Sequence, residues 1–380
     1  MTMVKRRVRM GMVGGGPGAL IGPIHRIAAE LDREIVLVAG AFSSDAKRSI
    51  AGGAAYAIEP ERAYPSLAAM LTAERGREDG IEMVAIASPN HHHLGAARAA
   101  LEAGVAVMCD KPLTATLDEA RDLERLVRAA GLPFGVTYTY SGYPLVREAR
   151  ARVAAGALGA IRKVVVEYPQ GWLAGKAEGK QAAWRIDPAM AGSGGCIADI
   201  GVHAFHLAEF VAGLKVTRLL ADLAAVVPGR VLDDDCQLLL RFENGARGVL
   251  LASQISVGER NGLRLRVYGE HGGLDWQQEQ PNRLWLYRAD GGTELIQAGD
   301  ASLGADAVAA SRTPGGHPEG YLEAFANLYR DFAGLVRGEK ALLLPGIEAG
   351  VRGMMLIDAA VRASRDEAGW IDFGQSGSGS

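Results

Sequence analysis

Short runs rich in valine and isoleucine alternate with helical patterns between residues 8 and 130, and this alternation constrains the fold more than any other feature. The runs IVLVAGAF and MVAIA are apolar throughout, and helical patterns such as HHLGAARAALEAG separate such runs. Continuously apolar strands separated by helices are typical of a parallel sheet that is covered on both faces. We therefore predict a doubly wound α/β domain over residues 1–135.

The pattern changes after about residue 145. From residue 216 to about residue 296, apolar runs follow one another with no helical pattern between them, which favours an antiparallel or mixed sheet. We predict a second, α+β domain over residues 136–372 with one large, mostly antiparallel open sheet, and a flexible tail over 373–380. Helices are expected in this part at 144–155, 197–211, 321–335 and 347–363.

The charge and cysteine content exclude several classes of protein. The chain has 41 basic and 44 acidic residues, so nothing favours nucleic acid or an anionic membrane as a partner. No run approaches the roughly 18 apolar residues that cross a bilayer. The three cysteines lack CxxC spacing, which favours reduced thiols over a zinc site or disulfides. We expect a cytoplasmic protein with no membrane association and no metal site.

A glycine-rich stretch, GMVGGGPGALIGPIHR, follows the first apolar run. Gly14 and Gly16 form a GxG, but five residues separate Gly16 from Gly22. With a strand before it and a helix after it, such a turn lets the backbone approach a pyrophosphate, and the helix N-terminus supplies free N–H groups. We interpret Gly14 and Gly16 as dinucleotide-binding residues; the alternative is a plain turn with surplus glycine.

The end of the second apolar run bears on which dinucleotide binds. An acidic residue at this place would accept hydrogen bonds from the 2′-hydroxyl of NAD, but the sequence AFSSDAKRS has Ser43 and Ser44 there. Ser43 with Lys47 or Arg48 could hold the 2′-phosphate of NADP instead. The same residues fit an ordinary helix start capped by Ser44 or Asp45. The cofactor is therefore predicted to be NAD or NADP.

Three later motifs follow predicted strands or a glycine turn: ASPNHHH at 87–93, CDKPLTATLDEA at 109–120 and GGCIADIGVHAFH at 194–206. Together they resemble the Gfo/Idh/MocA family of glucose–fructose oxidoreductase and inositol dehydrogenase, over nearly the whole chain. The family's Glu-Lys-Pro corresponds to Asp110, Lys111 and Pro112. Its Asp-x-Gly-x-His corresponds to Asp199 and His203 around Gly201.

The resemblance implies a Rossmann domain, a C-terminal α/β domain whose open sheet makes oligomer contacts, and NAD or NADP. It implies hydride transfer between that cofactor and a secondary carbinol of a sugar or cyclitol, in a homo-oligomer, either a dimer or a tetramer. Two departures from the family pattern stand out. The glycine loop is three residues longer, so Gly22 and His25 match only if an insertion is accepted, and His206 replaces an acidic residue.

The chemistry of alcohol oxidation requires a base for the hydroxyl proton. Asp199 and His203 are spaced i, i+4, which on an α-helix places them on one face, where a carboxylate orients an imidazole. Lys111 follows a parallel strand, where ligands lie in open α/β sheets. We assign His203 as proton acceptor, Lys111 as orienting and electrostatic residue, and Asp199 as partner of the substrate or of the histidine. An exchange of roles between Lys111 and His203 remains open.

Further residues are candidates with weaker support, because packing explains each of them as well. For the cofactor they are Ser88, Asn90, His93, Asp110 and Lys111. For the substrate they are Tyr138, Tyr140, Trp172, Trp184, Arg185 and His206. The run His91 to His93 does not indicate a metal site, because consecutive side chains point in different directions.

Three functions remain possible. The leading one is an NAD(P)-dependent oxidoreductase acting on a sugar, sugar derivative or inositol-like polyol. The alternatives are a glycoside-cleaving enzyme that oxidises its substrate only transiently, and a non-catalytic nucleotide-sensing regulator. A regulator would not need Lys111, Asp199 and His203, which weighs against it.

Overall fold

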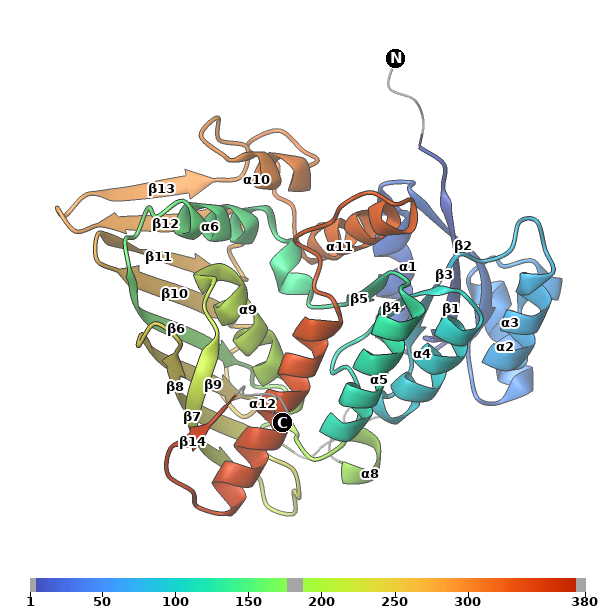
Figure 1. Ribbon diagram of the computed structural model, residues 1–380, viewed down its shortest axis with the longest axis horizontal. Helices are drawn as coiled ribbons and strands as arrows, with labels where there is room; N and C mark the ends of the chain where they lie inside the picture. The colour runs from blue at the N-terminus through green and yellow to red at the C-terminus, as the bar shows by residue number, and fades with distance from the viewer. Residues whose placement is uncertain (1–4, 176–186, 374–380) are drawn as a thin grey trace. The chain divides into compact units, whose positions relative to one another are not determined.

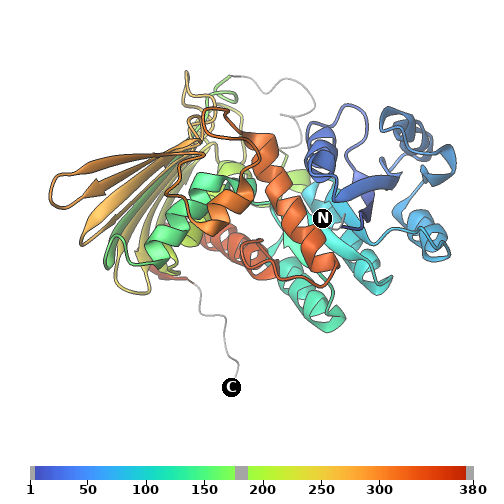
Figure 2. The same ribbon diagram turned by 90° about the horizontal axis from the view of Figure 1, so that it is seen from above.

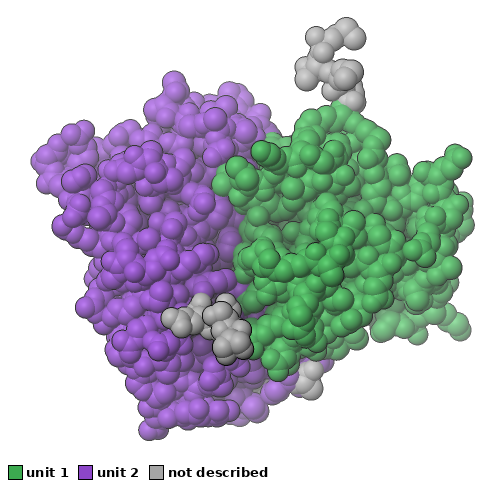
Figure 3. Space-filling view, viewed as in Figure 1, with its two compact units in different colours: residues 1–139, 325–351 green, residues 140–324, 352–380 purple. Residues whose placement is uncertain are grey.

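The structure is a computed structural model that describes residues 5–175 and 187–373. It divides into two compact units, shown in Figure 3. The first unit comprises residues 1–139 and 325–351, and the second comprises 140–324 and 352–380. The division falls within two helices, α11 (Tyr321–Val336) and α12 (Ile347–Arg365).

The first unit contains the predicted parallel sheet. Five strands pair in the order β2-β1-β3-β4-β5, and every pair is parallel. Helices connect successive strands (Figure 1), and all five residues of β3 are buried, which accounts for the continuous apolar runs. The strands are β1 (Val8–Gly14), β2 (Ile35–Ala41), β3 (Met83–Ala87), β4 (Ala106–Cys109) and β5 (Phe134–Val136). The helices are α1 (Ile21–Leu31), α2 (Ala46–Ala55), α3 (Leu67–Arg75), α4 (His93–Glu102) and α5 (Leu117–Ala130), with 3₁₀ turns η1 (Pro60–Arg62) and η2 (Asn90–His92).

The strand order places a switch point beside β1. The chain runs outward from β1 to β2, then returns to β3 on the other side of β1. In open α/β sheets, ligands bind outside the carboxyl ends of the strands at such a point. The residues that follow β1 and β3 are therefore the first place to look for a binding site.

The second unit contains a nine-stranded sheet in the order β13-β12-β11-β10-β6-β9-β8-β7-β14. All its pairs are antiparallel except β6 with β9, so the predicted mostly antiparallel sheet is confirmed. Buried and more exposed residues alternate along β8, because helices cover one face of the sheet (Figure 2). The strands are β6 (Ile161–Pro169), β7 (Val216–Ala224), β8 (Asp235–Phe242), β9 (Arg247–Ser253), β10 (Arg264–Gly269), β11 (Gly272–Gln277), β12 (Arg283–Arg288), β13 (Thr293–Gln297) and β14 (Ile371–Asp372). The remaining helical elements are η3 (Thr139–Gly142), α6 (Pro144–Ala154), α8 (Pro188–Ala191), η4 (Ile197–Gly201), α9 (Val202–Ala212) and α10 (Ala305–Ala310).

The helix expected at 197–211 differs from the prediction at its start. Residues Ile197–Gly201 form a π-helical turn, and the α-helix α9 begins only at Val202. Gly201 leaves room for the Ile197 side chain, since a Cβ on Gly201 would lie 2.7 Å from Ile197 Cδ1. Asp199 therefore lies in a widened turn, and the simple α-helical spacing assumed for Asp199 and His203 is wrong.

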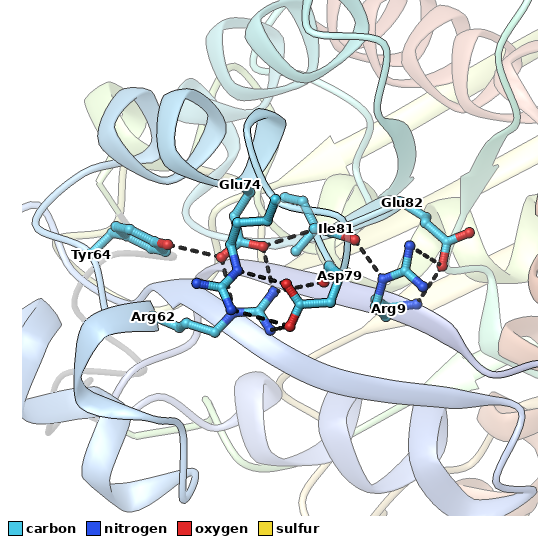
Figure 4. A network of polar contacts seen from close by, with 9 residues as sticks. Arg9, Arg62, Tyr64, Glu74, Asp79, Ile81 and Glu82 are labelled. Carbon is cyan, nitrogen blue, oxygen red and sulfur yellow. Dashed lines mark hydrogen bonds and ion pairs between the residues drawn. The ribbon is translucent and has the colours of Figure 1, made fainter.

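A buried ion pair lies beside the edge strand β2 of the first unit's sheet (Figure 4). Arg62 and Glu74 are 4% and 2% exposed, and Arg62 Nε donates to Glu74 Oε1 over 3.0 Å. The Tyr64 hydroxyl donates to the same oxygen over 2.8 Å, and the Ile81 N–H to Oε2 over 3.2 Å. Because Tyr64 N–H also donates to Gly40 O of β2, this pair fastens α3 to the sheet edge.

Over the described residues, the helices are too short or too polar to pass through a lipid bilayer.

Candidate functional site

The glycine loop closes tightly against the two strands beside it. Gly14 ends β1 with φ +77°, and a Cβ there would lie 2.9 Å from the backbone of Ser88. A Cβ on Gly16 would lie 2.5 Å from Phe42 O. Both positions therefore require glycine, and they leave a backbone surface that an extended phosphate chain can approach closely.

Gly22 performs the packing role of the third glycine despite the longer loop. It is the second residue of α1, and a Cβ there would lie 2.1 Å from Gly15 O and 2.5 Å from Gly15 Cα. The inserted residues thus loop out, and the helix still begins directly against the turn. In the described structure no side chain caps the first turn of α1, so its N–H groups are available to an anion.

Ser88 supplies an orphaned polar atom at the switch point. It follows β3, and its Oγ is buried without a hydrogen-bond partner among the described residues. A buried hydroxyl without a partner costs about 1–3 kcal/mol, so this atom indicates a ligand group. The Gly14 and Gly16 backbone together with Ser88 fit a dinucleotide. Asn90, also predicted to bind the cofactor, is 5% exposed at the start of η2.

The helix start after β2 is capped by Asp45. Its Oδ1 accepts from Arg48 N–H over 2.8 Å, and Ser43 Oγ accepts from Asp45 N–H over 3.2 Å. The predicted capped helix start is thus confirmed, with Asp45 as the cap. Lys47 and Arg48 are exposed, and so is Ser44. This arrangement is compatible with either dinucleotide.

His93 fastens the turn after β3 to the loop that contains Lys111. The ring is 1% exposed; its Nε2 lies 2.8 Å from Ser88 O, and its Nδ1 lies 3.0 Å from Pro112 O and 3.3 Å from Leu113 O. Burial lowers the pKa of His93. Both ring nitrogens face backbone carbonyls, and the neutral ring donates to one of them, so this predicted cofactor residue packs between the two loops.

Asp110 is an ionised carboxylate that faces the protein interior. Its Oδ1 accepts from the Lys111 N–H over 3.0 Å and from the Thr137 hydroxyl, and its Oδ2 lies 3.9 Å from His25 Nε2. Burial alone would favour the neutral acid, but His25, Lys111 and Thr137 hold the pKa of Asp110 well below its usual range. Lys111 itself comes two residues after β4, as expected for a ligand-facing position.

Asp199 lies in the π-helical turn of the second unit. Gln254, which follows β9 and is 3% exposed, donates to Asp199 Oδ2 over 2.9 Å. Asp233 holds the start of the turn, because its carboxylate accepts from Gly195 N–H over 2.6 Å and from Ile197 N–H over 2.7 Å. Burial raises the pKa of Asp233 to about 6. Single π turns within helices are frequent at functional sites.

His203 lies at the start of α9 beneath an aromatic ring. It is 9% exposed, and the Tyr140 ring meets it edge-on at 4.9 Å. The hydroxyls of Tyr140 and Tyr168 share a hydrogen bond, and Asn261 completes a closed triangle with Tyr168 at 2.7 Å and with Tyr140 at 3.4 Å. Burial raises the pKa of both tyrosines, so the triangle is uncharged and fixes the ring that covers His203.

The other residues predicted to bind the substrate differ in how far they are exposed. Tyr138 is 1% exposed, whereas Trp172 is 46% exposed and donates from Nε1 to Gln170 Oε1 over 2.9 Å. His206 stacks on Phe210 at 5.6 Å; burial, with nearby Lys215 and Arg150, lowers the pKa of His206 to about 3. His206 is thus neutral where the family has an acid. Trp184 and Arg185 lie outside the described residues.

An open hollow of about 610 Å³ lies within the second unit and borders this aromatic group. Tyr143 and Tyr321 line it, and each of these rings lies 6.4 Å from the Tyr140 ring. Its size is within the range of small-molecule sites. Among the described residues, no cluster of three or more His, Cys, Asp or Glu side chains is placed to hold a metal ion.

Sequence reasoning missed Gln254, Tyr168 and Asn261. Tyr168 is the next-to-last residue of β6, which is a position that could have drawn attention. Gln254 and Asn261 lie in the loop between two strands, and no local pattern marks them. They were found only through contacts that span 55 to 121 residues of sequence.

Comparison with known proteins gives consistent results. Residues 8–138 match the profile of an oxidoreductase family with an NAD-binding Rossmann fold, and residues 146–275 match the GFO/IDH/MocA C-terminal domain. The chain is 35% identical to the oxidoreductase YfiI of Bacillus subtilis (strain 168) over 387 residues, which cover 98% of each chain.

Solved structures agree in fold over nearly the whole chain. An inositol dehydrogenase homologue from Azotobacter vinelandii in complex with NAD⁺ superposes with a TM-score of 0.93, at 36% identity and 98% coverage of both chains. The complex of the Azotobacter vinelandii homologue with NADH and myo-inositol gives a TM-score of 0.91, at 35% identity, covering 97% of this chain and 98% of that one.

Proposed function

Because the chain belongs to the Gfo/Idh/MocA family of NAD-binding oxidoreductases, we propose that it transfers a hydride between NAD and a secondary carbinol of a sugar, a sugar derivative or an inositol-like polyol. The observation that carries the proposal is the likeness, at 35% identity over 97% of the chain, to a protein solved with NADH and myo-inositol. The retained Lys111, Asp199 and His203 supply the groups that such a reaction needs.

The first unit supplies the residues that would hold the cofactor. The backbone at Gly14 and Gly16 and the N-terminus of α1 would hold the pyrophosphate, and the orphaned Ser88 hydroxyl would gain a partner. NAD, when bound, supplies the hydride acceptor or donor. NADP is the alternative cofactor, and exposed Arg48 is the residue that would favour it.

The second unit supplies the residues that handle the substrate proton. His203 accepts the hydroxyl proton in the oxidation direction, and the fixed Tyr140 ring keeps the imidazole in one orientation. Asp199, anchored by Gln254, binds a substrate hydroxyl or orients His203. Lys111, which belongs to the first unit, would orient the substrate and stabilise developing negative charge on its oxygen.

Binding and turnover together test this function. We would titrate the protein with NAD⁺, NADH, NADP⁺ and NADPH, then follow the absorbance of reduced nicotinamide with myo-inositol, D-glucose and other sugars. Net reduction of NAD⁺ by at least one polyol is expected. Binding without net reduction but with cleavage of a glycoside would favour transient oxidation, and binding without any chemistry would favour a regulator.

We also propose a homo-oligomer, a dimer or a tetramer, in the cytoplasm. The sheet face opposite the helices presents large apolar side chains, among them Leu239, Tyr268 and Tyr287, which are 44%, 37% and 37% exposed. A second copy would cover such a surface. The three cysteines are free and buried thiols, as suits a reducing compartment. Light scattering after size exclusion measures the oligomer, and a monomer would contradict it.

A further inference from the structure

A buried row of polar side chains lies behind Lys111 in the first unit, and the proposed reaction gives it no role. Tyr329 on α11 contacts His25 on α1, whose ring is 0% exposed, with 2.6 Å between the Tyr329 oxygen and Nδ1. The other ring nitrogen, Nε2, lies 3.9 Å from Oδ2 of Asp110. Asp110 in turn accepts the N–H of Lys111.

The direction of the hydrogen bonds along this row follows from the groups involved. Burial, with the nearby Asp110 charge, raises the pKa of Tyr329 well above its usual value, so the hydroxyl keeps its proton. The Asp110 carboxylate can only accept, so the tautomer that suits this row has its ring proton on Nε2, facing the carboxylate, and leaves Nδ1 to accept from Tyr329. Among the described residues, Nε2 has no hydrogen-bond partner, and the Asp110 carboxylate lies 3.9 Å from it as a charge contact.

Packing alone does not account for a histidine at this position. The ring of Phe325 lies 4.9 Å from the His25 ring, and the surroundings are fully buried. An apolar ring would fill the same space without the cost of burying polar nitrogens. What a histidine adds is a proton directed at Asp110 and an acceptor for Tyr329.

The row ends at the backbone of Lys111. The Asp110 carboxylate fixes the Lys111 N–H at 3.0 Å, and His93 holds the carbonyls of Pro112 and Leu113 on the following side. The segment that carries the lysine is therefore held on both sides by polar contacts. On the Asp110 side, the Thr137 hydroxyl donates to Oδ1 of the carboxylate, and Nε2 of His25 lies 3.9 Å from Oδ2.

We propose that His25 is a positioning residue for the reaction: with Tyr329 it orients the Asp110 carboxylate, which fixes the backbone of Lys111. The inference rests on the proposed function, because it takes Lys111 as a residue of the reaction. His25 acts through Asp110 and Lys111 and is itself shielded from solvent. Its loss therefore affects turnover and leaves cofactor binding nearly unchanged.

His25→Phe tests the proposal, because phenylalanine keeps the ring and removes both nitrogens. We expect kcat with the polyol that is turned over to fall about tenfold to a hundredfold, as for a small misplacement of a reacting group, with KM and the Kd of NADH within about twofold of wild type. Tyr329→Phe, which removes a single oxygen, should lower kcat in the same direction by less. Phe325→Leu, a packing change against the same His25 ring, is the matched control and should keep kcat.

Hydrogen exchange gives a readout that needs no substrate. In His25→Phe and Tyr329→Phe, the peptide spanning residues 109–114 should exchange its amide hydrogens faster than in Phe325→Leu.

Parallel measurements on Lys111→Ala separate this inference from the proposed function. If Lys111→Ala keeps wild-type turnover, the role of Lys111 is wrong, and the inference falls with it. If Lys111→Ala abolishes turnover while folded His25→Phe and Tyr329→Phe keep wild-type kcat and wild-type exchange at 109–114, the proposed function stands and the positioning role of His25 is overturned. Where no polyol is turned over, unchanged exchange in both variants overturns the inference by itself.

Discussion

Gln254 fixes one oxygen of Asp199: the side-chain amide donates to Oδ2 over 2.9 Å, from a position 55 residues further along the chain. Gln254 is 3% exposed and follows strand β9, while Asp199 lies in a π-helical turn. A buried loop residue directly after a sheet strand thus orients a carboxylate that lies on a less regular element. Functional groups that are held in this way lose little conformational freedom when a substrate binds.

Removal of this contact should impair the reaction. In Gln254→Ala we expect kcat to fall about tenfold, because the carboxylate of Asp199 loses its fixed orientation. Gln254→Glu should be worse, since two adjacent carboxylates resist ionising together. Steady-state rates of nicotinamide reduction measure both. Gln237→Ala, at an exposed glutamine on β8, is the matched control, and equal rates in Gln254→Ala and Gln237→Ala would contradict the orienting role.

Substitution of Lys111 or His203 should lower the turnover rate and leave the affinity for NADH nearly unchanged. Lys111→Ala and His203→Ala should each lower turnover by a factor on the order of 10² to 10⁴, the range for loss of a proton-transfer or electrostatic group. Fluorescence titration should give NADH dissociation constants near that of wild type. A loss of NADH binding in both variants would count against the roles assigned here.

Arg48 should discriminate between the two dinucleotides if NADP is the cofactor. Its position just after the Asp45 cap places it near the end of β2, where the ribose lies in this fold. Arg48→Ala should then weaken NADPH at least about tenfold, the loss of one charge-assisted contact, and leave NADH unchanged. Calorimetric titration of both cofactors decides this. Equal effects on the two would remove Arg48 from the site and favour NAD alone.

Asp233 should make stability depend on pH. Burial raises the pKa of Asp233 from 3.8 to about 6, so between these values the folded state binds a proton that the unfolded state has lost. The stabilising contribution of this proton is fully present below about pH 4 and is lost as the pH rises through 6, about 2–3 kcal/mol in all.

Asp233→Asn isolates that contribution, because all other carboxyl groups are shared with wild type. Between pH 4 and about pH 7, wild type should lose about 2–3 kcal/mol of unfolding free energy relative to Asp233→Asn. Urea denaturation across this range measures the difference. A difference that stays constant with pH would show that Asp233 titrates normally.

The buried pair of Arg62 and Glu74 should dominate the stability of the first unit's edge. Glu74→Gln removes the buried counter-ion of the Arg62 guanidinium and leaves only the more exposed Asp79 carboxylate at 3.3 Å, which should cost about 3 kcal/mol of unfolding free energy. Glu78→Gln, at an exposed glutamate four residues away, should change stability by less than about 0.5 kcal/mol. Similar urea midpoints for the two variants would contradict the role given to Glu74.

The elements of both sheets could be predicted because each strand carries its own signal. The run Met83–Ala87 is apolar throughout because β3 is covered on both faces, and β8 alternates because one of its faces is open. The motif at Lys111 also has a local signal, since the lysine comes two residues after the apolar run that forms β4. In contrast, the spacing of apolar residues over one turn does not distinguish a π turn from an α-helix. The widened turn at Asp199 was therefore missed.

The amino-acid sequence by itself determined the two classes of sheet, the glycine turn and the positions in the chain of Lys111, Asp199 and His203. Only the tertiary structure decided which groups surround these residues and the rest of the site. Gly22 is required because α1 approaches Gly15. Burial, with Lys215 and Arg150, lowers the pKa of His206, and His25, Lys111 and Thr137 lower the pKa of Asp110 against the effect of burial. Local patterns record which face of an element is buried, whereas contacts and pKa values depend on groups that folding brings together from distant parts of the chain.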